Sequence, residues 1–362
     1  MGPVNTRHHQ KSIASVLAQE TIQPIRWQYD GLKLLDQRVL PERVVYLNID
    51  DVYATAAAIT DMVVRGAPAI GITAAYGVVL AARQRYQEDP TTWRDNIKPD
   101  LRHLKYARPT AINLAWAVDH ISRLIDTLTN IDPVPQLLAV AQRIHADDIA
   151  ANRRMGELGA ALIGPSSAVL THCNAGALAT GGYGTALGVI RAGVTQGRIA
   201  QVYADETRPW LQGSRLTAWE LAQDNIPVSL IADGAAAWLM KQGQIQWVIV
   251  GSDRIAANGD VANKIGTYST AVSAHHHGVR FMVVAPSTTV DMETASGDGI
   301  PIETRAEDEL LCIGGKRVAP AQVSAWNPVF DITPAELIDV IVTEKGVVER
   351  PDRNGITRMM DA

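Results

Sequence analysis

The sequence predicts an α/β protein in which a doubly wound parallel sheet follows a smaller, mainly helical N-terminal region with a short antiparallel meander. Three observations support this fold class. Short β-rich runs alternate with helical patterns beyond residue 165, Ala-rich helical patterns occupy residues 50–130, and Pro133 and Pro135 separate the two regions. Strands that alternate with helices form parallel sheets covered on both faces. We therefore expect two domains, over residues 1–133 and 134–362.

The N-terminal region is predicted to begin with the meander. Residues 25–49, "IRWQYDGLKLLDQRVLPERVVYLNI", alternate apolar and polar side chains around a turn at Asp30-Gly31. Helical patterns follow in "DVYATAAAITDMVV" (51–64) and "PTAINLAWAVDHISRLIDTL" (109–128). A long helix is expected over residues 135–164, because Gly164 ends its apolar periodicity.

The second region is predicted to be a Rossmann-like domain. Six short apolar runs are expected as strands: 168–172, 200–204, 227–231, 247–251, 280–285 and 338–344. Helical patterns separate most of them, as in "RLTAWELAQDN" and "GAAAWLMKQG". Sheets of this kind bind ligands beyond the carboxyl ends of their strands.

Composition narrows the class of function. The chain has 362 residues, of which 47% are hydrophobic and 20% charged, and its formal net charge is −5. This balance gives no general attraction to nucleic acid or to anionic membranes, and no run of 18 apolar residues predicts a membrane span. The two cysteines, Cys173 and Cys312, form no pair motif. A reducing, cytoplasmic setting is expected.

Three polar residues fall at predicted strand ends and so become candidates for the site. Cys173 follows "AVLTH", Asp205 follows "QVYA" and Asp253 follows "WVIVGS". Burial at such an edge raises the pKa of an aspartate towards acid–base use. The alternatives are a helix cap for Asp253 and a small buried residue for Cys173, since free cysteine is commonly buried.

The glycine-rich run after Cys173 matches no nucleotide motif. Gly176 and Gly181 have the spacing of a P-loop, but Gly182 and Tyr183 occupy the positions of its lysine and serine or threonine. The dinucleotide-binding fingerprint does not match either, because the glycines are spaced one residue too far apart. What remains is a backbone with free amides at a helix start, which we expect to approach a simple phosphate or a sugar.

Cationic and amide side chains in four other segments are candidates for binding an anionic ligand. They are Arg65, Arg108, Arg208, Gln212, Arg215, Asn263 and Lys264. The run His275-His276-His277 does not predict a metal site, because consecutive helical residues point in different directions. The polar segment around residues 291–317 is left open as a lid, an oligomer contact or a surface loop.

Taken together, these segments resemble the methylthioribose-1-phosphate isomerase family. The resemblance rests on "RGAPAIG", "RPTAINLAW", "THCNAGALATGGYGTALG", "DETRPWLQGSRLTAWEL", "GSDRIAANGDVANKIGTY" and "FMVVAPSTT", and it extends from about Trp27 to Glu349. The sequence departs at Thr304, where the family's "IPIEER" reads "IPIETR". The superfamily also contains ribose-1,5-bisphosphate isomerase and the regulatory subunits of the translation-initiation exchange factor, so fold alone does not decide the function.

The resemblance implies roles residue by residue. Cys173 matches the catalytic cysteine, and Asp253 matches the aspartate regarded as proton donor. Arg65, Gly66, Ala67, Arg108, Gln212, Asn263 and Lys264 match substrate-binding positions. The implied reaction converts 5-methylthioribose 1-phosphate to 5-methylthioribulose 1-phosphate in methionine salvage, without metal or organic cofactor, in a homodimer. The alternatives are an isomerase of ribose 1,5-bisphosphate or 5-deoxyribose 1-phosphate, and a non-enzymatic regulatory subunit.

Overall fold

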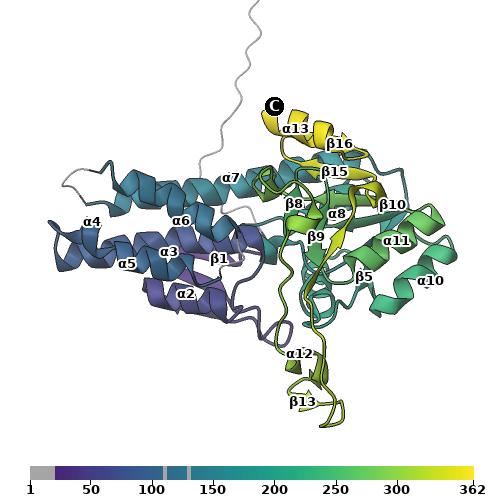
Figure 1. Cartoon of the computed structure of the whole chain (residues 1–362), viewed down its shortest axis with the longest axis horizontal. Helices are drawn as coiled ribbons and strands as arrows, with labels where there is room; N and C mark the ends of the chain where they lie inside the picture. The colour runs from purple at the N-terminus through teal and green to yellow at the C-terminus, as the bar shows by residue number, and fades with distance from the viewer. Residues whose placement is uncertain (1–20, 109–111, 129–131) are drawn as a thin grey trace, which may run out of the picture.

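The computed structural model describes residues 21–108, 112–128 and 132–362. A helical half and a sheet-containing half lie side by side, joined by one long helix (Figure 1). No helix within these residues is long and apolar enough to cross a membrane.

The predicted meander is confirmed. Strands β1 (Ile25–Gln28), β2 (Gly31–Leu35) and β3 (Tyr46–Ile49) pair antiparallel in chain order. Tyr29 and Asp30 make the first turn with φ of 51° and 59°, a left-handed conformation typical of tight hairpins. The inner face of the meander, including Leu32 and Leu34, packs into the helical core.

Helices fill the rest of the first half: α2 (Val52–Thr60), α3 (Ala67–Glu88), α4 (Trp93–Asn96), α5 (Lys98–Lys105) and α6 (Ile112–Ile125). The start of the helix predicted from residue 109 lies outside the described residues. α3 is buried on all sides from Ala69 to Ala82, which fits its lack of a polar face. The predicted long helix is α7 (Val134–Ala161), which packs on the helical core through Leu137 and Ala141 and on the sheet through Met155.

The six predicted strands form the parallel part of a seven-stranded sheet. They are β4 (Ser167–Thr171), β5 (Ile199–Asp205), β6 (Val228–Ile231), β7 (Trp247–Val250), β10 (Arg280–Val284) and β15 (Val340–Thr343), with β16 (Gly346–Glu349) antiparallel at one edge. The order is β16-β15-β10-β7-β4-β5-β6. The chain therefore builds outward from β4 in one direction and from β7 in the other.

Both faces of this sheet are covered. On β7, Trp247 and Ile249 face a core that includes α7 and α8 (Ala186–Thr195), whereas Val248 and Val250 face α10 (Ala236–Lys241), α11 (Thr267–His277) and α13 (Arg353–Asp361). Alternate side chains of a strand point to opposite faces, so a strand covered on both sides is apolar throughout. The fold class predicted from the sequence is confirmed.

A second, four-stranded sheet was not predicted. Its order is β11 (Val290–Asp291), β8 (Arg254–Ala256), β9 (Val261–Lys264) and β14 (Phe330–Thr333). No strand was expected over residues 261–264, yet all four residues of β9 are buried. Beyond this sheet, α12 (Asp308–Leu311) and the hairpin of β12 (Cys312–Ile313) and β13 (Lys316–Arg317) form an arm that projects from the molecule (Figure 1).

Candidate active site

A pocket lies at the carboxyl ends of β4 and β7, beside the N-terminus of α3. Strands β4 and β7 are neighbours, and the chain order reverses between them. Open α/β sheets bind ligands at such a switch point, because the connections on either side leave in opposite directions. The nine residues to which the family resemblance assigns roles all line this pocket: Arg65, Gly66, Ala67, Arg108, Cys173, Gln212, Asp253, Asn263 and Lys264. The other candidates from the sequence, Asp205, Arg208 and Arg215, are not part of its wall.

Cys173 is held at the end of β4 by its backbone. Its φ is +62°, a left-handed conformation that is uncommon outside glycine. Its N–H donates to Thr207 Oγ1 at 2.8 Å, and its carbonyl accepts from Thr217 Oγ1 at 2.5 Å. Because two side chains from other segments fix this strained turn, the thiol faces the pocket rather than continuing the strand.

Asp253 lies across from Cys173, after β7. Its N–H donates to Ala262 O at 2.9 Å, which joins it to β9. The next element is strand β8, so the helix-cap alternative is wrong. The Asp253 side chain is exposed to the open pocket, yet the protein atoms packed around the carboxyl desolvate it, and this desolvation raises its pKa, with Lys264 and Arg108 partly opposing the shift. A carboxyl in this setting retains its proton to higher pH than an ordinary aspartate.

Lys264 ends β9 inside the pocket wall. Its Nζ donates to Val329 O at 2.7 Å and lies 4.0 Å from the centre of the Phe330 ring. Burial lowers its pKa to about 8, although the nearby Cys173 and Asp253 favour the charged form. The preceding residue, Asn263, is also buried and donates to Thr267 Oγ1 at 3.0 Å.

Arg65, Gly66 and Ala67 bring the helical half to the pocket. Arg65 donates through NH1 to Asn174 Oδ1 at 2.9 Å and through NH2 to Asn174 O at 2.5 Å. Gly66 has φ of +92°, and a Cβ there would lie 2.5 Å from Ala179 O. Glycine is therefore required where α3 begins. Helix N-terminal amides attract anions, and those of α3 are at this wall.

Arg108 and Gln212 complete the predicted set. The Arg108 guanidinium is 3.6 Å from a Glu303 carboxylate oxygen, so it enters the pocket as one half of an ion pair. Gln212 comes just before a π-helical turn, Gly213–Thr217, that leads into α9 (Ala218–Gln223). Its buried Oε1 has no hydrogen-bond partner among the described residues. A buried acceptor of this kind is ready for a ligand hydroxyl.

The glycine-rich run does not expose its amides as expected. Glu220 accepts the N–H groups of Ala177 at 2.8 Å and Leu178 at 3.0 Å, and Asp148 accepts that of Gly181 at 2.7 Å. A Cβ on Gly176 would lie 2.4 Å from a Glu220 oxygen. For these positions the expected phosphate cradle is wrong: the small residues admit the protein's own carboxylates, which fix the loop behind Cys173.

The pocket also contains residues that the sequence reasoning did not assign, among them His172, Asn174 and Arg305. The first two are the sequence neighbours of Cys173, and this position is what could have identified them as site residues. Arg305 comes from the segment around 291–317, and its NH2 lies 3.0 Å from Glu309 Oε2. No local pattern shows that this segment returns to the pocket, because its return depends on the fold of the second sheet.

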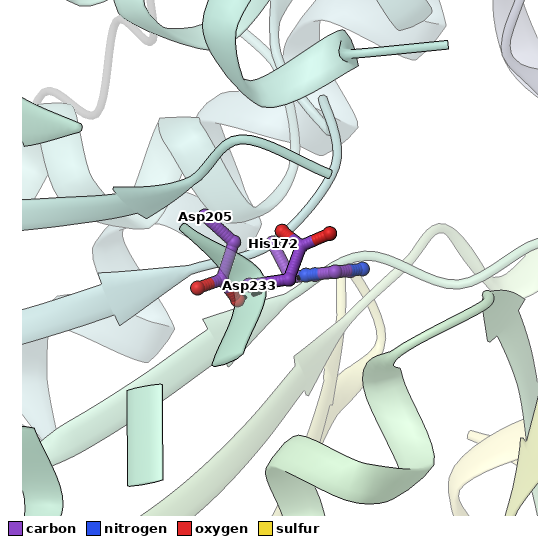
Figure 2. Close-up of side chains that lie close together, drawn as sticks. All are labelled: His172, Asp205 and Asp233. Atoms are coloured by element: carbon purple, nitrogen blue, oxygen red, sulfur yellow. Dashed lines mark hydrogen bonds and ion pairs between the residues drawn. The ribbon is translucent and has the colours of Figure 1, made fainter. Parts of the chain in front are cut away.

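His172, Asp205 and Asp233 are the one cluster of potential metal ligands found within the described residues (Figure 2). Their candidate atoms lie within 4.8 Å of one another, and all but one of the polar atoms already have partners; the exception is Asp205 Oδ1, which is buried with no partner among the described residues. His172 Nδ1 is 2.9 Å from Asp205 Oδ2, and the two Asp233 oxygens accept the N–H groups of Thr207 and Arg208 at 2.7 and 2.8 Å. The cluster is a hydrogen-bond network joining β4, β5 and the turn that carries Asp233.

Comparison with known proteins places this geometry in a family. The model of the initiation factor 2 subunit family matches residues 63–350. A methylthioribose-1-phosphate isomerase of Thioalkalivibrio sulfidiphilus is 64% identical over 95% of this chain and 98% of its own length. The enzyme of the same name from Pseudomonas aeruginosa is 58% identical over 95% and 97%.

Solved structures agree in fold. The crystal structure of 5-methylthioribose 1-phosphate isomerase from Pyrococcus horikoshii superposes with a TM-score of 0.89 at 40% identity, covering 97% of this chain and 99% of that one. A structure described as translation initiation factor eIF-2B, subunit delta, from A. fulgidus has a TM-score of 0.85 at 41% identity, covering 94% and 100%. The chain therefore belongs to the initiation factor 2 subunit family, in the branch formed by the methylthioribose-1-phosphate isomerases.

Proposed function

We propose that this chain converts 5-methylthioribose 1-phosphate to 5-methylthioribulose 1-phosphate, an aldose–ketose isomerisation of methionine salvage. One observation carries the proposal: Cys173 and Asp253 line the same pocket, at the point where the strand order of the sheet reverses. The chain's high identity to proteins named methylthioribose-1-phosphate isomerase supports it. A regulatory subunit of the same fold has no need to keep both groups there.

The chemistry of this substrate accounts for the two groups. Its anomeric oxygen carries the phosphate, so the furanose ring cannot open as a free aldose does. An acid must protonate the ring oxygen while hydrogen moves from C2 to C1. Asp253 supplies that proton, because burial favours its neutral form. Cys173 transfers a proton at carbon or stabilises the developing charge. This scheme uses only side chains of the chain itself.

The phosphate is expected near the cations and the α3 N-terminus. Arg65 and Lys264 face the same pocket and supply charge-assisted hydrogen bonds. Gln212 offers its unpartnered Oε1 to a sugar hydroxyl. The ligand thus contacts both halves of the molecule. We also propose a cytoplasmic setting, in which the Cys173 thiol stays reduced, and a homodimeric assembly, as in the family that the sequence resembles.

A neighbouring cavity suits an apolar substituent at C5 of the sugar. It shares Gly66, Ala67, Arg108, Asp253 and Phe330 with the main pocket, and its other walls are mainly apolar: Ile70, Ile112, Ala262, Ile300, Pro301 and Ile302. Its arginines are already paired, Arg108 with Glu303 and Arg254 with Asp291, each at 3.6 Å. A methylthio group fits this wall, whereas a second phosphate would find no free cation among these residues.

Turnover of the purified protein with three substrates tests the function. We expect kcat/KM for 5-methylthioribose 1-phosphate to exceed that for ribose 1,5-bisphosphate by about 100-fold or more, because a phosphate would be desolvated against apolar walls. The 5-deoxyribose 1-phosphate should fall between them, since a small apolar group contributes roughly 10- to 200-fold.

One variant links this preference to the cavity. Ile302→Ser, at a partly exposed position, should reduce turnover of the methylthio substrate more than that of the 5-deoxy sugar. Preference for ribose 1,5-bisphosphate would assign the chain to that isomerase instead. Binding without turnover of any of the three would favour a regulatory subunit.

The pKa of Lys264 predicts how anion binding depends on pH. Since burial lowers that pKa to about 8, the lysine is charged below pH 8 and loses its charge above it. The inhibition constant of sulfate, which keeps its charge over this range, should therefore rise between pH 8 and pH 9.5. In Lys264→Met, the inhibition constant of sulfate should be high at every pH and should not change with pH. A flat profile in the parent protein would show that the anion binds elsewhere.

A further inference from the structure

The ring of His172 has an acceptor at each of its nitrogens. Nε2 lies 2.9 Å from Ile265 O, and Nδ1 lies 2.9 Å from Asp205 Oδ2. A carbonyl oxygen can only accept, so Nε2 must carry a proton. One further proton is then shared between Nδ1 and the carboxylate. Figure 2 shows the His172, Asp205 and Asp233 side chains gathered at this point.

Burial raises the pKa of Asp205 and so opposes the ion pair, but the groups around the ring favour its charged form. The His172 and Asp205 side chains are each 1% exposed. Two more carboxylates, Asp233 and Asp331, interact electrostatically with the imidazole. Although burial opposes a charge here, the hydrogen bonds and the carboxylates outweigh it and raise the pKa of His172. Asp331 itself is fixed by the backbone N–H of Gly266, at 2.7 Å.

A second buried histidine provides the contrast. His145 also has Nε2 against a carbonyl, Gly181 O at 2.8 Å, but its Nδ1 faces the Tyr76 hydroxyl at 3.2 Å. A hydroxyl can donate to an unprotonated nitrogen, whereas an ionised carboxylate cannot. Burial accordingly lowers the pKa of His145 to about 4, and this ring is neutral. The partner of Nδ1 decides the charge.

The position of the ring connects two parts of the site. His172 directly precedes Cys173 at the end of β4, and Ile265 directly follows Lys264 at the end of β9. The ring also packs closely on the start of α11, because a Cβ on Gly266 would lie 2.8 Å from His172 Cε1. A tightly packed ring with two fixed hydrogen bonds cannot turn without moving one of these segments.

We propose that His172 is a positioning residue: an imidazolium paired with Asp205 that fixes Cys173 and Lys264 relative to each other across the pocket. This inference rests on the proposed function for its kinetic consequence, but not for the charge state of the ring. His172 acts through its neighbours and needs no contact with the substrate.

The charge state is tested first, by ¹⁵N NMR of histidine-labelled wild-type protein at pH 7.5. The His172 resonances, assigned by their loss in His172→Gln, should show two protonated nitrogens. His145, assigned in the same way with His145→Gln, should show one protonated and one unprotonated nitrogen as the internal control. Finding one unprotonated nitrogen in the His172 ring would overturn the proposal, whether or not the protein is an isomerase.

The positioning role is tested with Asp205→Asn, which keeps the shape of the pair but lets the amide donate to a neutral Nδ1. We expect His172 to lose its Nδ1 proton in the spectrum and kcat to fall by about tenfold or more, with KM changed less than threefold. His172→Gln should show the same split between kcat and KM. If both variants, folded by circular dichroism, keep kcat within twofold of wild type, the positioning role is wrong. Absence of turnover in the wild type would instead contradict the proposed function.

Discussion

Cys173→Ser is expected to lower kcat by roughly 10³-fold, or about 4 kcal/mol of barrier, while binding of the product persists. A hydroxyl holds its proton far more tightly than a thiol and is a poorer group for proton transfer at carbon. The fold should be unaffected, since the Thr207 and Thr217 hydroxyls bond only the backbone of residue 173. Steady-state kinetics and product binding by calorimetry measure the two effects separately.

The chain supplies a matched control for this experiment. Cys312 is the other free cysteine, half-buried on β12 in the projecting arm and not part of the pocket wall. Cys312→Ser should keep kcat and KM at the parent values. A loss smaller than tenfold in Cys173→Ser would remove the thiol from the chemical step, and an equal loss in both variants would indicate a general effect of cysteine replacement.

Asp253→Asn is expected to lower kcat by a similar factor, about 10³-fold, because an amide cannot deliver a proton to the ring oxygen. In the parent protein, activity should fall as pH rises through the pKa of Asp253, since only the protonated carboxyl acts as the acid. Desolvation by the surrounding protein raises that pKa, so the active form persists to higher pH than for an ordinary aspartate. The residual activity of the variant should not show this decrease as pH rises.

Stability gives an independent check on the same carboxyl. A carboxyl whose pKa is raised by folding stabilises the folded state at low pH, and this contribution is lost as pH rises above the unfolded value. Asp253→Asn should therefore match the parent Tm at low pH and equal or exceed it at neutral pH. Asp298→Asn, an exposed change outside the pocket wall, serves as the control for kcat. A variant that keeps its rate, or that loses Tm at neutral pH, contradicts the assignment of Asp253 as a neutral acid.

Local periodicity was sufficient to predict most of the fold. The meander was expected from a two-residue pattern and α7 from a 3.6-residue pattern, because an element buried on one face repeats its apolar side chains at that interval. The six parallel strands were expected from short apolar runs, because a strand covered on both faces is apolar throughout. The division at residues 133 and 134 stays a prediction. Helix α7 runs on from there, and its two halves contribute to different cores.

The nine site residues were also found from the sequence, and for two different reasons. Cys173 and Asp253 stand at the carboxyl ends of recognisable strands, so the topology of parallel sheets brings them to one edge. Arg65, Arg108 and Lys264 were identified through the family resemblance together with their charge. The structure brings them together, while their roles in binding and catalysis remain our proposal.

What only the tertiary structure decided are the contacts between segments far apart in the chain. The sequence by itself determined where Cys173 lies, but not that Thr217, 44 residues away, clamps its carbonyl. It determined the glycine run, but not that Glu220 occupies its amides, nor that β9 is a strand paired with β14. The His172 ring meets Ile265 across 93 residues. Such contacts leave no local periodicity, because they depend on how α9 and the second sheet, which are distant in the sequence, pack around the end of the first sheet.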